Sequence, residues 1–157
     1  DVFGPRLKTR YSDPQALVDL SREADLLIGS VSIPGKRAPK LISRAMVKNM
    51  KRGAVIVDVA IDQGGSSETS RPTTHSAPTY IEEGVVHYCV TNMPAACSRT
   101  ATEALTQATL PLLQILARDA MAALRDHPGL RAGLQVYRGQ ITHAGLAQDL
   151  GLPQGHI

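Results

Sequence analysis

The chain has 157 residues and a mass of 16.8 kDa, the size of one ordinary domain with a core of its own. Hydrophobic residues make up 43% of the sequence and aromatic residues only 3%, which excludes a disordered chain and requires an aliphatic core. The net charge of +3 comes from scattered Lys and Arg residues without an aromatic platform among them, so nucleic acid is not expected as a partner.

The amino-terminal part of the sequence alternates between strand and helix patterns. Residues 6–11 are compatible with a short strand, after which Asp13 as N-cap and Pro14 as first helical residue predict a helix to about residue 24. The almost wholly apolar run at 26–31 then predicts a parallel strand that is buried on both faces.

A second helix and two further strands follow. After the loop 32–39, Ser43 is expected to cap a helix that closes at Gly53, with the glycine at the C′ position. Residues 55–59 and 85–90 predict strands on either side of a long loop rich in Gly, Ser, Thr and Pro. Such alternation predicts an α/β fold with a doubly wound parallel sheet, of which this chain holds half.

The last third of the chain is helical. Apolar residues recur at helical spacing over residues 102–117, and Pro111 is expected to kink or divide that helix. A second helix is expected at 119–125, a small hairpin at 135–142 and a terminal helix at 143–149.

The cysteine content and the lengths of the apolar runs indicate where in the cell the protein is expected and whether it is expected to bind a metal. Only Cys89 and Cys97 are present, and the sequence shows neither a signal peptide nor a membrane span, so a cytoplasmic protein without a membrane partner is expected. These thiols and His87 are too few and too irregularly spaced for a zinc site, and no metal is expected.

A carboxylate, Asp62, lies just past the predicted strand at 55–59. Ligands of open parallel sheets bind outside the carboxyl ends of strands, and residues 31–32 and 92–93 follow two other predicted strands. Such a carboxylate would accept hydrogen bonds from a ribose or take part in acid–base chemistry, and the two glycines after it would let a ligand approach the backbone. The alternative is a simple turn, because Asp-Gln-Gly-Gly is also ordinary turn composition.

The dinucleotide fingerprint Gly-x-Gly-x-x-Gly does not occur after a first strand, nor does the acidic residue expected at the end of a second strand. Pyrophosphate binding is therefore not explained by these residues, and the sequence reads as if it opened partway through a fold.

Several segments resemble the alanine dehydrogenase family. They are Ala24-Asp-Leu-Leu-Ile-Gly-Ser-Val31, Val57-Asp-Val-Ala-Ile-Asp-Gln-Gly-Gly65, Arg71-Pro-Thr-Thr-His-Ser-Ala-Pro-Thr-Tyr80, His87-Tyr-Cys-Val-Thr-Asn-Met-Pro94 and Arg99-Thr-Ala-Thr-Glu-Ala-Leu-Thr-Gln-Ala-Thr-Leu-Pro111. The likeness covers nearly the whole chain. Its departures are Ser66-Ser67 where the family usually has Cys-Phe, Ser32 in place of an apolar residue, and Ala96-Cys97 in place of a small residue followed by Val-Pro.

The resemblance implies an enzyme that interconverts L-alanine with pyruvate and ammonia and passes hydride to or from NAD. It implies that Asp62 is catalytic and meets the nicotinamide ribose. The residues implied to contact NAD are Ser12, Val31, Ser32, Val59, Ala60, Ile61, Asp62, Asn92 and Met93. The family forms homo-oligomers, often hexamers.

The resemblance covers only the second half of the family. It implies that residues 1–94 are the second half of a Rossmann-like NAD-binding domain and that residues 95–157 are helices that pack on a substrate domain. That substrate domain, with its acid–base His, is missing, so an amino-terminal domain or chain is an expected partner and the chain alone is expected to be inactive.

Two alternatives remain open at this point. One is the soluble NAD(H)-binding domain of nicotinamide nucleotide transhydrogenase, and the other is a non-catalytic nucleotide-binding or assembly remnant. The pair Asp62-Gln63 and the segment Asn92-Met-Pro94 favour the dehydrogenase over the transhydrogenase.

Overall fold

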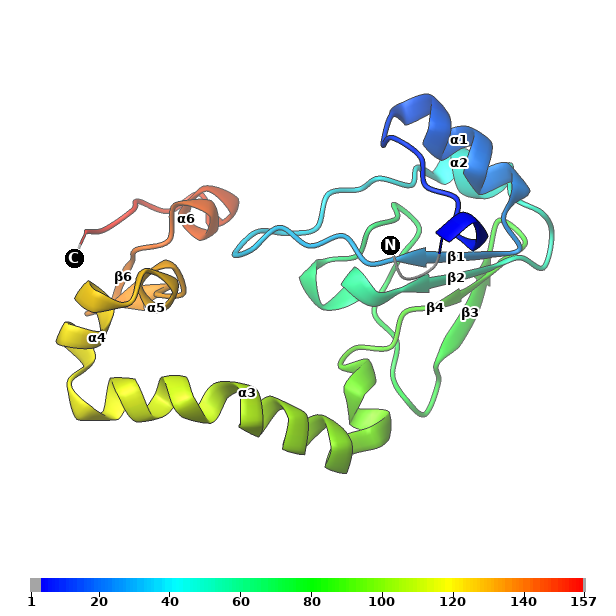
Figure 1. Cartoon of the computed structure of the whole chain (residues 1–157). Helices are drawn as coiled ribbons and strands as arrows, with labels where there is room; N and C mark the ends of the chain where they lie inside the picture. The colour runs from blue at the N-terminus through cyan, green and yellow to red at the C-terminus, as the bar shows by residue number, and fades with distance from the viewer. Residues whose placement is uncertain (1–3, 157) are drawn as a thin grey trace. The chain divides into compact units, whose positions relative to one another are not determined.

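A computed structural model of the chain describes residues 4–156, which form two compact units (Figure 1). The first unit contains the residues up to Val31 together with Ala38–Thr91. The second contains Ser32–Arg37 together with the residues from Asn92 onward.

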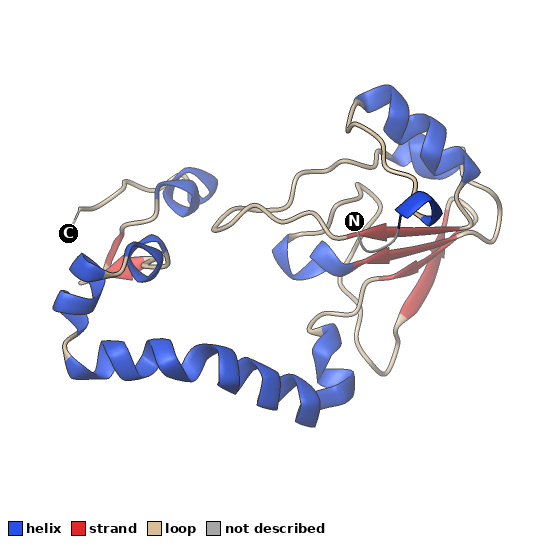
Figure 2. Ribbon diagram, viewed as in Figure 1, coloured by secondary structure: helices blue, strands red, loops and turns tan. Residues whose placement is uncertain are grey.

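A four-stranded sheet organises the first unit, with the strand order β1-β2-β4-β3 (Figure 2). Strands β1 (Leu26–Gly29), β2 (Val55–Asp58) and β4 (Val85–Tyr88) run parallel, and β3 (Thr79–Glu82) pairs antiparallel with β4. The apolar runs at 26–31, 55–59 and 85–90 that predict strands thus contain β1, β2 and β4. The predicted α/β class with a parallel sheet is confirmed.

Helices α1 (Pro14–Glu23) and α2 (Arg44–Lys48) begin at the predicted caps. Asp13 and Ser43 each accept the N–H of the residue three positions on, at 2.8 and 3.2 Å. The predicted role of Gly53 as C′ residue is wrong, because α2 already ends at Lys48 and Gly53 lies in a turn beyond it with φ +80°.

The core of the first unit is aliphatic, as the composition requires. Its side chains come from the strands, from α2 and from the segments beside α2, and Leu17, Val18 and Leu27 pack against it. The buried members are Ile42, Met46, Val47, Met50, Ala54, Ile56 and Val85.

Two predictions about the amino-terminal part are wrong. Residues 6–11 form no strand: in the part of the chain that the structure describes no strand pairs with them, and Tyr11 is 96% exposed. The predicted burial of both faces of β1 also fails, since Leu26 and Ile28 are 54% and 61% exposed. Within residues 4–156, β1 is an edge strand with β2 as its sole neighbour.

Strand β3 begins at the end of the long loop predicted at 63–80 and was not predicted from the sequence pattern. It joins β4 through a two-residue turn in which Glu83 has φ +51° and Gly84 has φ +78°. Positive φ at both central residues is the type I′ geometry that matches the twist of a hairpin. The Glu-Gly pair was therefore the signal for this strand.

The second unit is mainly helical. Its elements are η3 (Met93–Cys97), α3 (Ser98–Arg118), α4 (Ala120–Asp126), α5 (Pro128–Ala132), β5 (Val136–Tyr137), β6 (Gln140–Ile141) and α6 (Ala144–Leu150). Of the two effects expected of Pro111, a kink or a division of the long helix, the division is wrong, because α3 continues through Pro111. The hairpin and the terminal helix are confirmed. None of the helices in the described part of the chain is long and apolar enough to cross a membrane.

The loop that follows β1 belongs to the second unit, because its 32–37 segment bonds to α6. Lys36 Nζ donates to Gln148 Oε1 at 2.8 Å, and the Arg37 N–H donates to Asp149 Oδ2 at 2.6 Å. This loop is therefore held by side chains that lie far along the sequence.

Replacement of Ile56 by Ala tests the core. Ile56 is fully buried in β2, so the variant is expected to lose about 3 kcal/mol of unfolding free energy in urea titrations. The matched control is Ile81→Ala on β3, where the side chain is 72% exposed and the expected loss is below about 1 kcal/mol. Equal losses in the two variants would contradict the proposed core.

Candidate functional site

The turn that carries Asp62 begins where β2 ends, at the carboxyl edge of the parallel strands. It is the 3₁₀-helix η2 (Val59–Gln63), in which Ala60 and Ile61 are buried and Asp62 is exposed. Gly64 closes η2 with φ +98° and donates its N–H to the carbonyl of Ile61. The buried residues anchor the turn, and Asp62 faces outward at the edge where such sheets bind ligands.

A second carboxylate, Asp58, lies buried at the end of β2 and accepts hydrogen bonds from the loop after η2. Its Oδ2 accepts the N–H of Ser66 at 2.7 Å, the N–H of Ser67 at 3.3 Å and the hydroxyl of Ser70 at 2.6 Å. Its Oδ1 accepts the hydroxyl of Ser66 at 3.1 Å. These donors offset the desolvation of the carboxylate and hold the loop against the strand.

Lys40 holds the same loop from its other side. Its ammonium donates to the carbonyls of Gly64 and Ser67 at 2.5 and 3.0 Å. The backbone N–H groups of Ala38 and Leu41 donate to carbonyls in and beside the loop, each at 2.8 Å. The loop after Asp62 is therefore fixed by a strand residue and by a segment that precedes α2.

Tyr80 of β3 ties down the far end of this loop. Its hydroxyl donates to the carbonyl of Thr69 at 2.7 Å and accepts the N–H of Arg71 at 2.9 Å. The Arg71 guanidinium lies 3.8 Å above the Tyr80 ring centre. Burial raises the pKa of Tyr80, so the phenol keeps the proton with which it donates.

Glycine is required where β1 approaches this loop. A Cβ atom built on Gly29 would lie 2.1 Å from the hydroxyl oxygen of Ser66, closer than any two such atoms can be. A side chain at position 29 would therefore force the Ser66 hydroxyl out of the position from which it donates to Asp58.

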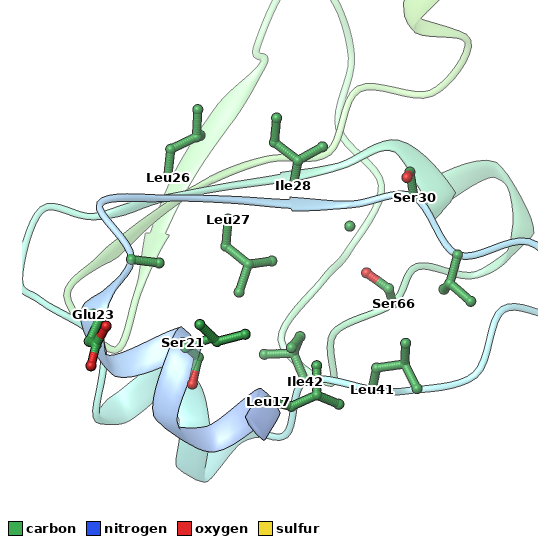
Figure 3. A pocket seen from close by; sticks show the side chains of 14 residues that line it. Leu17, Ser21, Glu23, Leu26, Leu27, Ile28, Ser30, Leu41, Ile42 and Ser66 are labelled. Atoms are coloured by element: carbon green, nitrogen blue, oxygen red, sulfur yellow. The ribbon is translucent and has the colours of Figure 1, made fainter. Parts of the chain in front are cut away.

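An apolar cavity of about 540 Å³ lies between β1, α1 and the segment that precedes α2 (Figure 3). Leu27 points from β1 into the space toward α1, while Leu26 and Ile28 point to the opposite side of the strand. Val31, a predicted cofactor contact, lines this cavity. The lining suits apolar side chains or the face of a flat ring.

The structure groups some of the predicted site residues. Those in η2 are Val59, Ala60, Ile61 and Asp62. Val31 follows β1, which packs against η2, and Ser12 lies exposed just before the cap of α1. Ser32, Asn92 and Met93 belong to the second unit, where Asn92 has φ +51° at the start of η3.

Three residues that fix the site were missed by the sequence analysis: Asp58, Lys40 and His87. In the sequence, Asp58 is one more residue of an apolar run that predicts a strand. A buried carboxylate needs donors, and the run Ser66-Ser-Glu-Thr-Ser70 a few residues later supplies four hydroxyls. That combination was the available signal.

Both cysteines are free thiols, Cys89 buried and Cys97 exposed. Between residues 4 and 156, no group of three or more His, Cys, Asp and Glu side chains could hold a metal ion.

Comparisons with known proteins agree on one family. The family described as alanine dehydrogenase/PNT, C-terminal domain, matches residues 1–144. An alanine dehydrogenase from Halomonas elongata is 53% identical over 97% of this chain and 41% of its own length. One from Bacillus subtilis is 54% identical over 96% of this chain and 40% of its own length. The chain thus spans about two fifths of the curated relatives it matches.

Among solved structures, this chain is more similar to an alanine dehydrogenase than to a transhydrogenase. An L-alanine dehydrogenase matches 96% of this chain and 42% of its own, with a TM-score of 0.76 and 45% identity. A transhydrogenase from Sinorhizobium meliloti matches 56% of this chain and 24% of its own, with a TM-score of 0.51 and 27% identity.

Replacement of Asp58 by Ala tests the anchoring of the loop. Because it leaves several buried donors without an acceptor, the variant is expected to lose about 3 kcal/mol of unfolding free energy or more. Asp25→Ala is the control, since its ion pair with Lys51 is exposed and contributes below about 1 kcal/mol. A cost for Asp58→Ala no larger than that of the control would show that the carboxylate does not hold the loop.

Proposed function

Because the chain belongs to the alanine dehydrogenase/PNT family, we propose that it is the nicotinamide-binding part of an enzyme that interconverts L-alanine with pyruvate and ammonia. The supporting observation is the 53% identity with an alanine dehydrogenase over 97% of the chain. The likeness to a transhydrogenase is weaker in both identity and extent. The dehydrogenase is therefore the function that the residues support best.

The residues at the carboxyl edge of the sheet fit the nicotinamide ribose end of NAD. The exposed carboxylate of Asp62 can accept hydrogen bonds from ribose hydroxyls. A Cβ built on Gly64 would meet nothing within 4 Å, so the backbone there is open to a ligand. Val59 is 47% exposed and offers an apolar contact. When bound, NAD supplies the acceptor for the hydride of the substrate.

In this proposal each residue has a limited task. Asp62 holds the ribose and is the catalytic residue of the chain, Val31 and Ser32 contact the adenosine half, and Ser12 lies near the adenine. Asn92 and Met93 border the substrate and the nicotinamide. The backbone of Ala60 and Ile61 makes the remaining contacts, because their side chains are buried.

We extend this assignment to the domain organisation, the oligomeric state and the cellular location of the protein. Residues 1–94 serve NAD binding, and residues 95–157 belong to a substrate domain whose other residues, including the acid–base His, come from a further domain or chain. The complete protein is a homo-oligomer in the cytoplasm, where its two free thiols suit a reducing compartment.

The test uses the complete polypeptide that contains residues 1–157, purified with its intact mass recorded and assayed for alanine-dependent NADH formation. Asp62→Asn is expected to lower kcat by about 100-fold or more, because the neutral amide removes the carboxylate charge from the site and holds the ribose less well. Asp25→Asn, at the opposite end of the sheet, is the control and is expected to retain full activity.

The two possible failures are distinct. A polypeptide of any mass without alanine-dependent NADH formation would refute the enzyme and leave a non-catalytic nucleotide-binding module. An active enzyme in which Asp62→Asn keeps its kcat would refute the role of Asp62 alone.

A further inference from the structure

His87 is a fully buried histidine to which the proposed reaction assigns no task. It lies in the middle of β4, and both of its ring nitrogens have partners. Nδ1 lies 3.0 Å from the carbonyl oxygen of Val85, and Nε2 lies 2.8 Å from the hydroxyl oxygen of Thr69. The ring also stacks on Tyr80, with centroids 4.9 Å apart and 18° between the planes.

These partners determine where the protons lie. A carbonyl oxygen only accepts, so Nδ1 of His87 carries the hydrogen, and in a neutral imidazole Nε2 is then an acceptor. The Thr69 hydroxyl must therefore donate to Nε2. Having used its single proton, Thr69 Oγ1 accepts the hydroxyl proton of Ser67 at 2.9 Å. Ser67 Oγ in turn accepts the Thr69 N–H at 3.3 Å.

His87, Thr69 and Ser67 thus form a relay of hydrogen bonds, and Ser67 joins this relay to the carboxylate of Asp58. Its N–H donates to Asp58 Oδ2, and its hydroxyl donates to Thr69 Oγ1. Ser67 is fully buried, as are Asp58 and His87, and Thr69 is only 3% exposed. Water therefore does not compete for these groups, and each lost bond would leave a buried polar atom without a partner.

We propose that His87, as a neutral imidazole protonated on Nδ1, is a positioning residue that acts through Thr69 and Ser67 on the loop behind Asp62. The relay fixes the loop from β4 while Asp58 fixes it from β2, so two neighbouring strands hold it. The loop begins directly after Gly64, which closes the turn that carries Asp62. The effect of this relay on catalysis rests on the proposed function. The assignment of the His87 proton to Nδ1 does not rest on it.

The kinetic test compares two substitutions at one position in the complete polypeptide. Thr69→Val keeps the shape but removes the hydroxyl, and it is expected to raise KM for NAD and lower kcat/KM by about tenfold, because a small displacement of a positioned group is costly. Thr69→Ser keeps the hydroxyl and is expected to stay within about twofold of the wild type. Thr79→Val, the same change at an exposed position of β3, is the control.

Thermal unfolding of each variant checks that it is folded. If Thr69→Val does not fold, Ser67→Ala replaces it, because it removes a hydroxyl of the same relay at a distance from the histidine ring. Impairment of Thr69→Ser equal to that of Thr69→Val would overturn the proposal, since the methyl group and not the hydroxyl would then matter. A folded Thr69→Val with wild-type KM and kcat would overturn it as well.

The spectroscopic test uses the 157-residue chain and needs no activity. Long-range ¹H–¹⁵N spectra are expected to show His87 with its proton on Nδ1, and Thr69→Val is expected to shift the Nε2 resonance because its donor is lost. A proton on Nε2 would overturn the relay. An Nδ1 proton on His87, together with a complete polypeptide that forms no NADH from alanine, would refute the proposed function and leave the relay intact.

Discussion

The buried carboxylate of Asp58 is the constraint on which the arrangement of the site depends. It stands at the end of a parallel strand, where an unpaired charge would cost several kcal/mol, on the order of the stability of a small domain. The chain satisfies it by folding the residues after η2 back onto the strand, so that Ser66, Ser67 and Ser70 all donate to it. The reversal follows directly on η2, in which Ala60 and Ile61 are buried and Asp62 is exposed.

The loops at the carboxyl edge are held by residues remote in sequence. The loop after β2 depends on Lys40, Tyr80 and His87, and the 32–37 segment after β1 depends on α6. Val31 and Ser32 are neighbours in the chain but belong to different compact units.

Local signals decided how much could be read from the sequence. A few adjacent residues determine a helix cap or an apolar strand, so these features can be predicted from the sequence. Examples are the caps Asp13 and Ser43 and the apolar runs of β1, β2 and β4. Strand β3 was missed because its Glu-Gly turn is short and polar, and the relay of His87 was missed because its members meet only after the strands pair. The departures from the family at Ser66 and Ser67 become meaningful in the structure, since both hydroxyls enter the buried network.

The close approach of Gly29 to Ser66 limits how this sequence can drift over evolutionary time. A side chain at position 29 collides with the Ser66 hydroxyl where it donates to Asp58, so either that hydroxyl rotates away or position 66 first loses its own side chain. That first step would deprive Asp58 of a hydroxyl donor, so the intermediate is disfavoured before the second change arrives. The two positions are thus coupled by a fitness valley, and descendants of this sequence should keep glycine at position 29 for as long as a polar side chain occupies position 66.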